Sequence, residues 1–247
     1  MAFRPIYEDA ASAVADVFDG ATIMLGGFSA ALGAPHDLFR AVLESTTARD
    51  LTWIGNGTPQ IATVSENGER HTVTFPIERV KKCICSFPVS PSLRRGFGSP
   101  FEAAFGEGTV DLELVPQGTL AERLRAGGAG IPAFFTPTGV GTLFAEGKEV
   151  REFDGKSYVL ERWLRADFAL VRAIKADRLG NLIYRNTARN FNPPMAMAAS
   201  ITIAEVDELV EPGELRPEEI VTPGIFVDRI YVRSHGNDGS EQRGRKV

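Results

Sequence analysis

The sequence predicts an α/β protein with an open, mostly parallel sheet flanked by helices and an additional β-rich region. Short apolar runs alternate with helical patterns, as parallel strands and their crossover helices require. A chain of 247 residues with 43% hydrophobic and 24% charged residues can bury a core without disulfides. We expect one domain over residues 1–233 and a polar, disordered tail over residues 234–247.

The first half of the chain repeats a strand, loop and helix order. A helical pattern spans residues 8–18 and another spans 35–43, where Asp37 lies near the start. The predicted strands are residues 21–25, 51–54, 80–86 and 110–115. Residues 56–75 have a weak pattern with several turn residues, so element boundaries are not predicted there.

The second half begins with the additional β-rich region. Residues 151–160 are predicted to form a hairpin around an Asp154-Gly155 turn, and residues 168–174 a buried strand. Residues 182–184, a small-residue helix from Met195 and a strand over residues 201–206 complete the predicted core.

Charge and composition exclude several function classes. The net charge of -5 argues against nucleic-acid or anionic-membrane partners, which favour a basic face. Cys83 and Cys85 are too few for a structural zinc set and are expected in the core, and the three histidines are scattered, so no metal is implied. No run approaches the roughly 18 apolar residues of a spanning helix, and no signal peptide is apparent, so a cytoplasmic protein is expected.

A glycine-rich loop follows the first predicted long strand. Gly26, Gly27 and Gly33 could let backbone amides approach a phosphate at a helix N-terminus. The segment GGFSAALG lacks the GxGxxG order, however, and no GxxxxGK[ST] occurs. Two interpretations remain, a tight turn alone or a substrate loop in which Phe28 is exposed.

Gln117 follows the strand predicted over residues 110–115. It is therefore expected at a strand's carboxyl end, where open α/β sheets place their ligands. An amide there could donate a hydrogen bond to a carbonyl oxygen that gains negative charge during acyl transfer. The alternative is a glutamine that only satisfies backbone groups of the turn.

The helix after Gln117 has its own signals. Thr119 and Glu122 fit a capping box, and Arg123 and Arg125 are expected as surface or interface charges, with a phosphate contact as the alternative. A C-cap explains one of the three glycines that follow, Gly127, Gly128 and Gly130, but not all of them.

A polar loop, YRNTARNFNPP, contains Arg185, Arg189, Asn190 and Asn192. Such residues often brace a loop against its neighbour. The alternative is that they face a partner subunit or a substrate carboxylate.

Several segments together resemble the alpha subunits of the 3-oxoacid CoA-transferases, with the 3-oxoadipate enzymes nearest. They are IMLGGFSAALGAPHDL, CSFP, VPQGTLAERLRAGGAGIPAFFTPTGVGTL, FDGKSYVLE, ADFALVRA, GNLIYRNTARNF and TPGIFVDRI. The resemblance covers residues 23–232, and its longest segment, from Val115 onward, is specific.

The resemblance implies ping-pong transfer of CoA from a donor such as succinyl-CoA to a 3-oxo acid such as 3-oxoadipate or acetoacetate, as in aromatic compound catabolism. A glutamate of a partner beta subunit would attack the thioester, in a hetero-oligomer such as α2β2, and no external cofactor is needed. By similarity, Gln117 is the catalytic residue of this chain. The substrate-binding residues would be Gly26, Gly27, Phe28 and Gly118, with Gly128, Gly130, Ile131 and Pro132 as an adjoining wall.

Two departures from the family pattern leave alternatives open. Ser65-Glu66-Asn67-Gly68 is like the start of the beta-subunit motif around the catalytic glutamate, but Glu69-Arg70-His71 follows where that motif has another glycine. A solvated turn is expected there, with a catalytic Glu66 as the alternative. Gly55-Asn56-Gly57 replaces the usual Asn-Asn-Ala-Gly turn, which leaves the acceptor acid open. The other interpretations are an acyl-CoA or ring-cleaving hydrolase of the same fold and a non-catalytic partner subunit.

Overall fold

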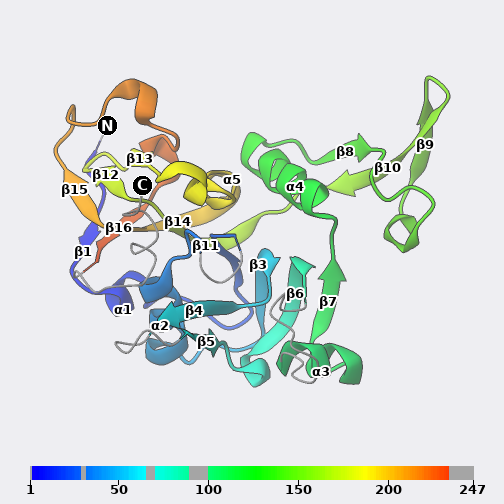
Figure 1. Ribbon diagram of the computed structural model, residues 1–247, viewed down its shortest axis with the longest axis horizontal. Coiled ribbons are helices and arrows are strands. Elements are labelled where there is room, and N and C mark those ends of the chain that lie inside the picture. The colour runs from blue at the N-terminus through cyan, green and yellow to red at the C-terminus, as the bar shows by residue number, and fades with distance from the viewer. Residues whose placement is uncertain (1, 29–31, 65–69, 89–99, 234–247) are drawn as a thin grey trace.

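A computed structural model describes residues 2–28, 32–64, 70–88 and 100–233. Its main element is a sheet of eight parallel strands in the order β1-β16-β14-β11-β2-β3-β6-β7 (Figure 1). The strands are β1 Ile6–Tyr7, β2 Thr22–Leu25, β3 Leu51–Gly57, β6 Val80–Phe87, β7 Asp111–Leu114, β11 Ala166–Arg172, β14 Ala199–Val206 and β16 Arg229–Val232. The predicted open parallel sheet is confirmed.

Helices cover both faces of this sheet. They are α1 Ala10–Ala13, α2 His36–Ser45, α3 Pro100–Glu107, α4 Gln117–Ala129 and α5 Asn192–Ala198. Figure 1 shows α1, α2 and α3 on the lower side of the view and α4 and α5 on the upper side. Within the described ranges, no helix is long and apolar enough to cross a membrane.

The strands between these two helix layers are apolar at consecutive positions because both of their faces are buried. Ile23, Trp53 and Cys83 pair across β2, β3 and β6 and belong to the core that α1, α2 and α3 cover. The next residues along the same strands, Met24, Ile54 and Ile84, belong to the second core, beneath α4 and α5. Successive residues of a strand point to opposite faces, so each run contributes to two cores.

Three smaller sheets complete the structure. A three-stranded antiparallel sheet extends away from the main sheet on the right of Figure 1. Its strands are β8 Ala133–Thr136, β9 Val150–Phe153 and β10 Lys156–Arg162. The β9–β10 hairpin confirms the predicted turn, because Asp154 and Gly155 have φ of 48° and 74°. The other two sheets are β13-β12-β15 (Leu182–Ile183, Lys175–Asp177, Glu208–Val210) and β4-β5 (Gln60–Val64, Arg70–Thr74).

One expectation about elements was wrong, and one region without a predicted element contains two strands. The helix expected over residues 8–18 is only Ala10–Ala13, because Val14 and Val17 enter the core from an irregular segment, and β-branched residues extend helices poorly. The antiparallel β4–β5 pair lies within residues 56–75, where the sequence pattern was weak. Glu66 and the expected polar tail over residues 234–247 lie outside the described residues.

Candidate active site

The strand order changes direction between β2 and β11. From β2 the chain continues to β3, β6 and β7 on one side, whereas β11, β14 and β16 follow on the other. Open α/β sheets bind their ligands at the carboxyl ends of the strands at such a switch point. The loop after β2, which begins at Gly26, lies at this point, and Gln117 lies at the same edge of the sheet after β7.

The first glycines of this loop allow close packing. The Gly26 amide donates to Leu170 O at 2.9 Å, and a Cβ on Gly26 would lie 2.0 Å from Asn192 Oδ1. Gly27 has φ of +110°, which side-chain-bearing residues rarely adopt. Both glycines therefore have a structural explanation, and their contact with substrate stays a prediction.

Phe28 is exposed, as the sequence indicated for a substrate loop. Its side chain is 40% exposed, and its ring stacks on Phe191 with a centroid separation of 6.4 Å. An exposed aromatic ring beside small residues offers an apolar surface at this edge of the sheet.

The asparagines of the polar loop brace it against the glycine loop, as expected. Asn192 is fully buried, its Oδ1 accepts from the Arg172 amide at 3.0 Å, and its Nδ2 donates to Gly33 O at 3.0 Å. Asn190 Nδ2 donates to Leu32 O at 3.0 Å. These bonds connect the segment after β2 with the start of α5. The two asparagines therefore connect the two segments at this part of the site.

The N-terminus of α2 is already occupied by a carboxylate. Glu205, from β14, accepts the amides of Asp37 and Leu38 at 2.9 and 3.0 Å. Complete burial raises the pKa of Glu205 to about 7, with the Asp37 charge adding to this and Arg172, the Leu38 amide and Arg233 opposing it. A helix N-terminus filled in this way leaves no place for a phosphate, which agrees with the missing nucleotide motif.

Gln117 is the first residue of α4 and follows β7, so its expected place at a strand's carboxyl end is confirmed. Its Nε2 donates to Asn56 Oδ1 at 2.5 Å. Asn56 is 6% exposed and lies near the end of β3. The sequence analysis noted Asn56 only as part of an altered turn. A polar side chain between two glycines at the end of a buried strand was the signal that could have identified it.

The remaining predicted site residues lie along and beyond α4. Gly118 is exposed in its first turn, and Gly130 caps the helix in the left-handed conformation. Gly130, Ile131 and Pro132 are thus separated from Gln117 by the length of α4, roughly 20 Å. These three residues therefore lie at the far end of α4 from Gln117, and their role as a pocket wall stays a prediction.

Gly127 and Gly128 lie inside α4 rather than at its end. A Cβ on Gly127 would lie 1.9 Å from Leu164 O, and one on Gly128 would lie 2.5 Å from Met197 Cβ in α5. These two glycines therefore let α4 approach its neighbours closely, and only Gly130 is the C-cap.

Two expectations about α4 were wrong. Thr119 is not a cap, because the helix begins at Gln117, and its buried Oγ1 has no hydrogen-bond partner within the described residues. Arg123 is not a surface charge. It is buried, pairs with Glu113 at 2.7 Å and donates to Arg162 O, which ties α4 to the base of the β8–β10–β9 sheet. Arg125 is exposed, as expected.

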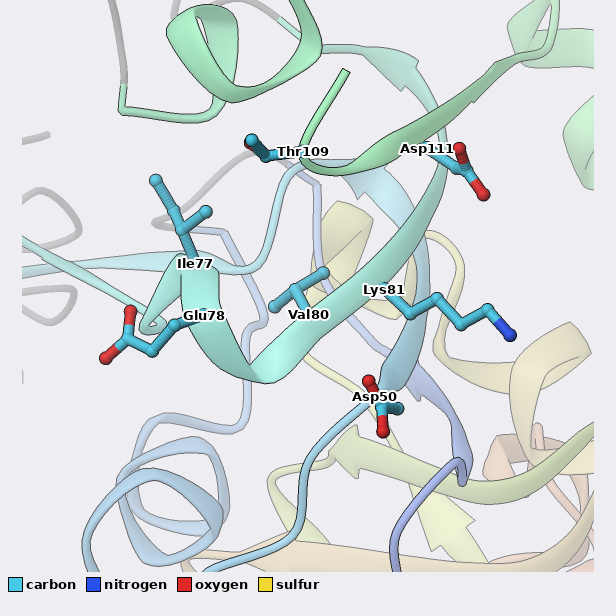
Figure 2. A pocket seen from close by; sticks show the side chains of 7 residues that line it. All are labelled: Asp50, Ile77, Glu78, Val80, Lys81, Thr109 and Asp111. Carbon is cyan, nitrogen blue, oxygen red and sulfur yellow. The ribbon is translucent and has the colours of Figure 1, made fainter. Parts of the chain in front are cut away.

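A shallow hollow lies at the opposite edge of the main sheet (Figure 2). It is close to the amino ends of β3, β6 and β7, and its lining residues are Asp50, Ile77, Glu78, Val80, Lys81, Thr109 and Asp111. No predicted site residue lines it.

Clusters of metal-ligand side chains and reactive thiols are two further groups to consider in the described part of the chain. No group of three or more His, Cys, Asp or Glu side chains there could hold a metal ion. Cys83 and Cys85 are buried as expected, and burial raises the pKa of both thiols, that of Cys85 to about 12. Neither thiol is thus a ready nucleophile. The arrangement instead offers an amide donor and an exposed aromatic ring at the carboxyl edge of the sheet.

Solved structures share this fold. Glutaconate coenzyme A-transferase from Acidaminococcus fermentans superposes with a TM-score of 0.74 at 20% identity, covering 96% of this chain and 77% of that one. The acyl-CoA transferase YdiF from E. coli O157:H7 also gives 0.74, at 22% identity, covering 94% of this chain and 47% of its own. At these identities the likeness concerns the fold.

Sequence relatives are much more similar. One subunit, designated A, of the 3-oxoadipate CoA-transferase of Pseudomonas putida is 52% identical over 92% of this chain and 93% of its own. The human mitochondrial succinyl-CoA:3-ketoacid coenzyme A transferase 2 is 43% identical over 91% of this chain and 44% of its own. The chain thus spans less than half the length of the human relative and of YdiF. A family described as coenzyme A transferase matches residues 7–233. This chain therefore belongs to the coenzyme A transferase family.

Proposed function

We propose that this chain is the alpha subunit of a CoA-transferase that moves CoA from a donor such as succinyl-CoA to a 3-oxo acid, 3-oxoadipate or acetoacetate. The observation that carries the proposal is the 52% identity to one subunit of a 3-oxoadipate CoA-transferase over nearly the whole of both chains. The exposed Phe28 and the Asn56–Gln117 pair at the switch-point edge agree with it.

The reaction divides between two polypeptides. A glutamate carboxylate on the beta chain attacks the thioester carbonyl, and the acyl–glutamyl anhydride forms as CoA thiolate leaves. The thiolate then attacks the glutamyl carbonyl, which gives a glutamyl-CoA thioester and releases the first acid. The acceptor acid reverses these steps. One thioester is made for each one broken, so the exchange needs no external cofactor.

Gln117 serves the steps in which charge develops on a carbonyl oxygen. One N–H of its amide is used by Asn56, and the second remains to donate to the oxyanion. A fixed donor of this kind lowers a barrier by about 2.7–4 kcal/mol when it is well aligned. Gly26, Gly27, Phe28 and Gly118 would line the acyl group, and Gly128, Gly130, Ile131 and Pro132 an adjoining wall.

The partner is the second element of the proposal. The names of the bacterial relatives imply a second subunit, and the human relative is more than twice as long as the segment that this chain matches. A cytoplasmic hetero-oligomer such as α2β2, acting in aromatic compound catabolism, is the assembly we propose.

The test is reconstitution with a beta subunit that carries a complete glutamate motif. We expect CoA transfer from succinyl-CoA to a 3-oxo acid only when both chains are present, and no steady release of free CoA without an acceptor acid. A hydrolase would release CoA without the acid. Full transfer by this chain alone, lost in Glu66→Ala, would place the nucleophile here and contradict the division of labour.

Gln117→Ala is the matching site variant. We expect kcat of the assembled enzyme to fall roughly ten- to a thousandfold with assembly intact. Unchanged turnover would remove Gln117 from the site.

A further inference from the structure

Two arginines of the loop before α5 have no partner in the described part of the chain. Arg185 and Arg189 are exposed, and neither guanidinium makes an ion pair or hydrogen bond with a described residue. Several other arginines are paired, among them Arg123 with Glu113 at 2.7 Å and Arg229 with Asp16 at 2.6 Å, whereas Arg49, far from the candidate site, is also without a side-chain partner among the described residues. Arg185 and Arg189 therefore keep all of their donors available to an anion.

The loop that carries this arginine pair is held in an unfavourable conformation. A short 3₁₀ turn, Asn186–Arg189, lies between Asn186 with φ of 49° and Asn190 with φ of 27°. Non-glycine residues in such regions cost free energy and persist only where their surroundings hold them. Asn190 and Asn192 supply that hold, because both donate to Ala188 O, at 2.9 and 3.1 Å. The arginines take no part in this bracing.

The position of the loop connects the arginine pair with the candidate site. Phe191 stacks on Phe28, and a Cβ on Gly33 would lie 2.3 Å from Ala188 O. The turn between Arg185 and Asn190 thus lies against the glycine loop at the switch point. Two permanent positive charges beside the candidate site attract an anion locally, although the protein as a whole has a net charge of -5.

We propose that Arg185 and Arg189 bind an anionic group of the substrates, either the free carboxylate of a dicarboxylic acyl group or a phosphate of CoA. The inference rests on the proposed function. Guanidinium groups bind carboxylate and phosphate oxygens in a bidentate geometry, so both sources fit the same chemistry. The pair positions the substrate and selects it, whereas the acyl exchange occurs at the partner's glutamate and Gln117.

The test uses Arg185→Gln, Arg189→Gln and the double variant in the reconstituted two-subunit enzyme. Arg49→Gln is the matched control, since Arg49 is exposed and lies just before β3, at the amino edge of the sheet. If the anion is the distal carboxylate, kcat/KM for succinate falls about ten- to a hundredfold while that for butyrate is unchanged. If it is a CoA phosphate, every acyl-CoA loses a similar factor in KM, and 3′,5′-ADP inhibits the variants more weakly than the unmodified enzyme.

Two results would overturn the inference. In the first, the unmodified enzyme transfers CoA, and all three arginine variants match its kcat/KM within twofold for both acids and for acyl-CoA. The other is weaker assembly with the beta chain at unchanged KM, which would assign the arginines to the subunit interface. An unmodified complex that transfers no CoA would instead contradict the proposed function.

Discussion

The hydrogen bond between Asn56 and Gln117 makes a quantitative prediction about catalysis. It joins the end of β3 to the first residue of α4, and at 2.5 Å it holds the Gln117 amide in one orientation. A neutral hydrogen bond contributes about 0.5–1.5 kcal/mol net. If that free energy serves to aim the second N–H at the oxyanion, Asn56→Ala lowers kcat about two- to twelvefold, because misalignment weakens the bond only in the transition state.

The assay is a double-mutant cycle in the reconstituted enzyme, with Asn56→Ala, Gln117→Ala, both together, and Gln60→Ala as a nearby amide control. Gln60 donates to Thr58 at the start of β4, and its loss is expected to leave kcat unchanged. With Gln117 already removed, Asn56→Ala is expected to add less than about twofold. An equal loss in both backgrounds would refute the reasoning, because Asn56 would then act independently of Gln117.

Three predictions concern folding, each tested by urea unfolding or amide exchange of the purified chain. Gly127→Ala should lower the free energy of unfolding by about 3 kcal/mol or more, since its Cβ would lie 1.9 Å from a backbone oxygen. Gly118→Ala should raise the free energy of unfolding by roughly 0.5–1 kcal/mol, because its Cβ would have nothing within 4 Å. Equal effects of the two substitutions would contradict the close packing at Gly127. The raised pKa of Glu205, about 7 against 4.5, means that the folded state binds this proton more tightly, so its contribution to stability is present below pH 4.5 and falls by about 3 kcal/mol as pH rises through 7. Glu205→Gln should remove this pH dependence of the free energy of unfolding. Parallel pH profiles of the variant and the unmodified protein would contradict the assignment to Glu205. Asn192→Ala should cost about 1–3 kcal/mol and speed exchange of the Arg172 amide, which loses its acceptor; unchanged exchange would show that the brace is not needed.

Local patterns in the sequence were sufficient for most of the main sheet. Runs that are apolar at consecutive positions predicted β2, β3 and the centre of β6 within a few residues, because strands buried on both faces must look this way. The edge strand β7 was instead predicted from alternating apolar and charged residues, and it is largely exposed. The Asp154-Gly155 turn was equally local. The same reasoning placed Gln117 at a strand end, because a proline and a helix start follow that strand directly.

Other features depend on residues that are distant in the sequence. Arg123 looked like a surface charge because its partners, Glu113 and the Arg162 carbonyl, approach only when α4 packs between β7 and β10. The carboxylate at the N-terminus of α2 comes from β14, 168 residues from Asp37. No spacing along the chain indicates such a pair.

The sequence by itself therefore determined most strands of the main sheet, the strand-end position of Gln117 and, through its long matching segments, the family. The tertiary structure alone decided that Asn56 holds Gln117 across 61 residues, that Asn192 fills the space above Gly26, and that Arg185 and Arg189 have no partners among the described residues. The physical reason is that periodicity and turn chemistry act over a few residues. Which strand ends become neighbours is set by burying both faces of one eight-stranded sheet, and that depends on the whole chain at once.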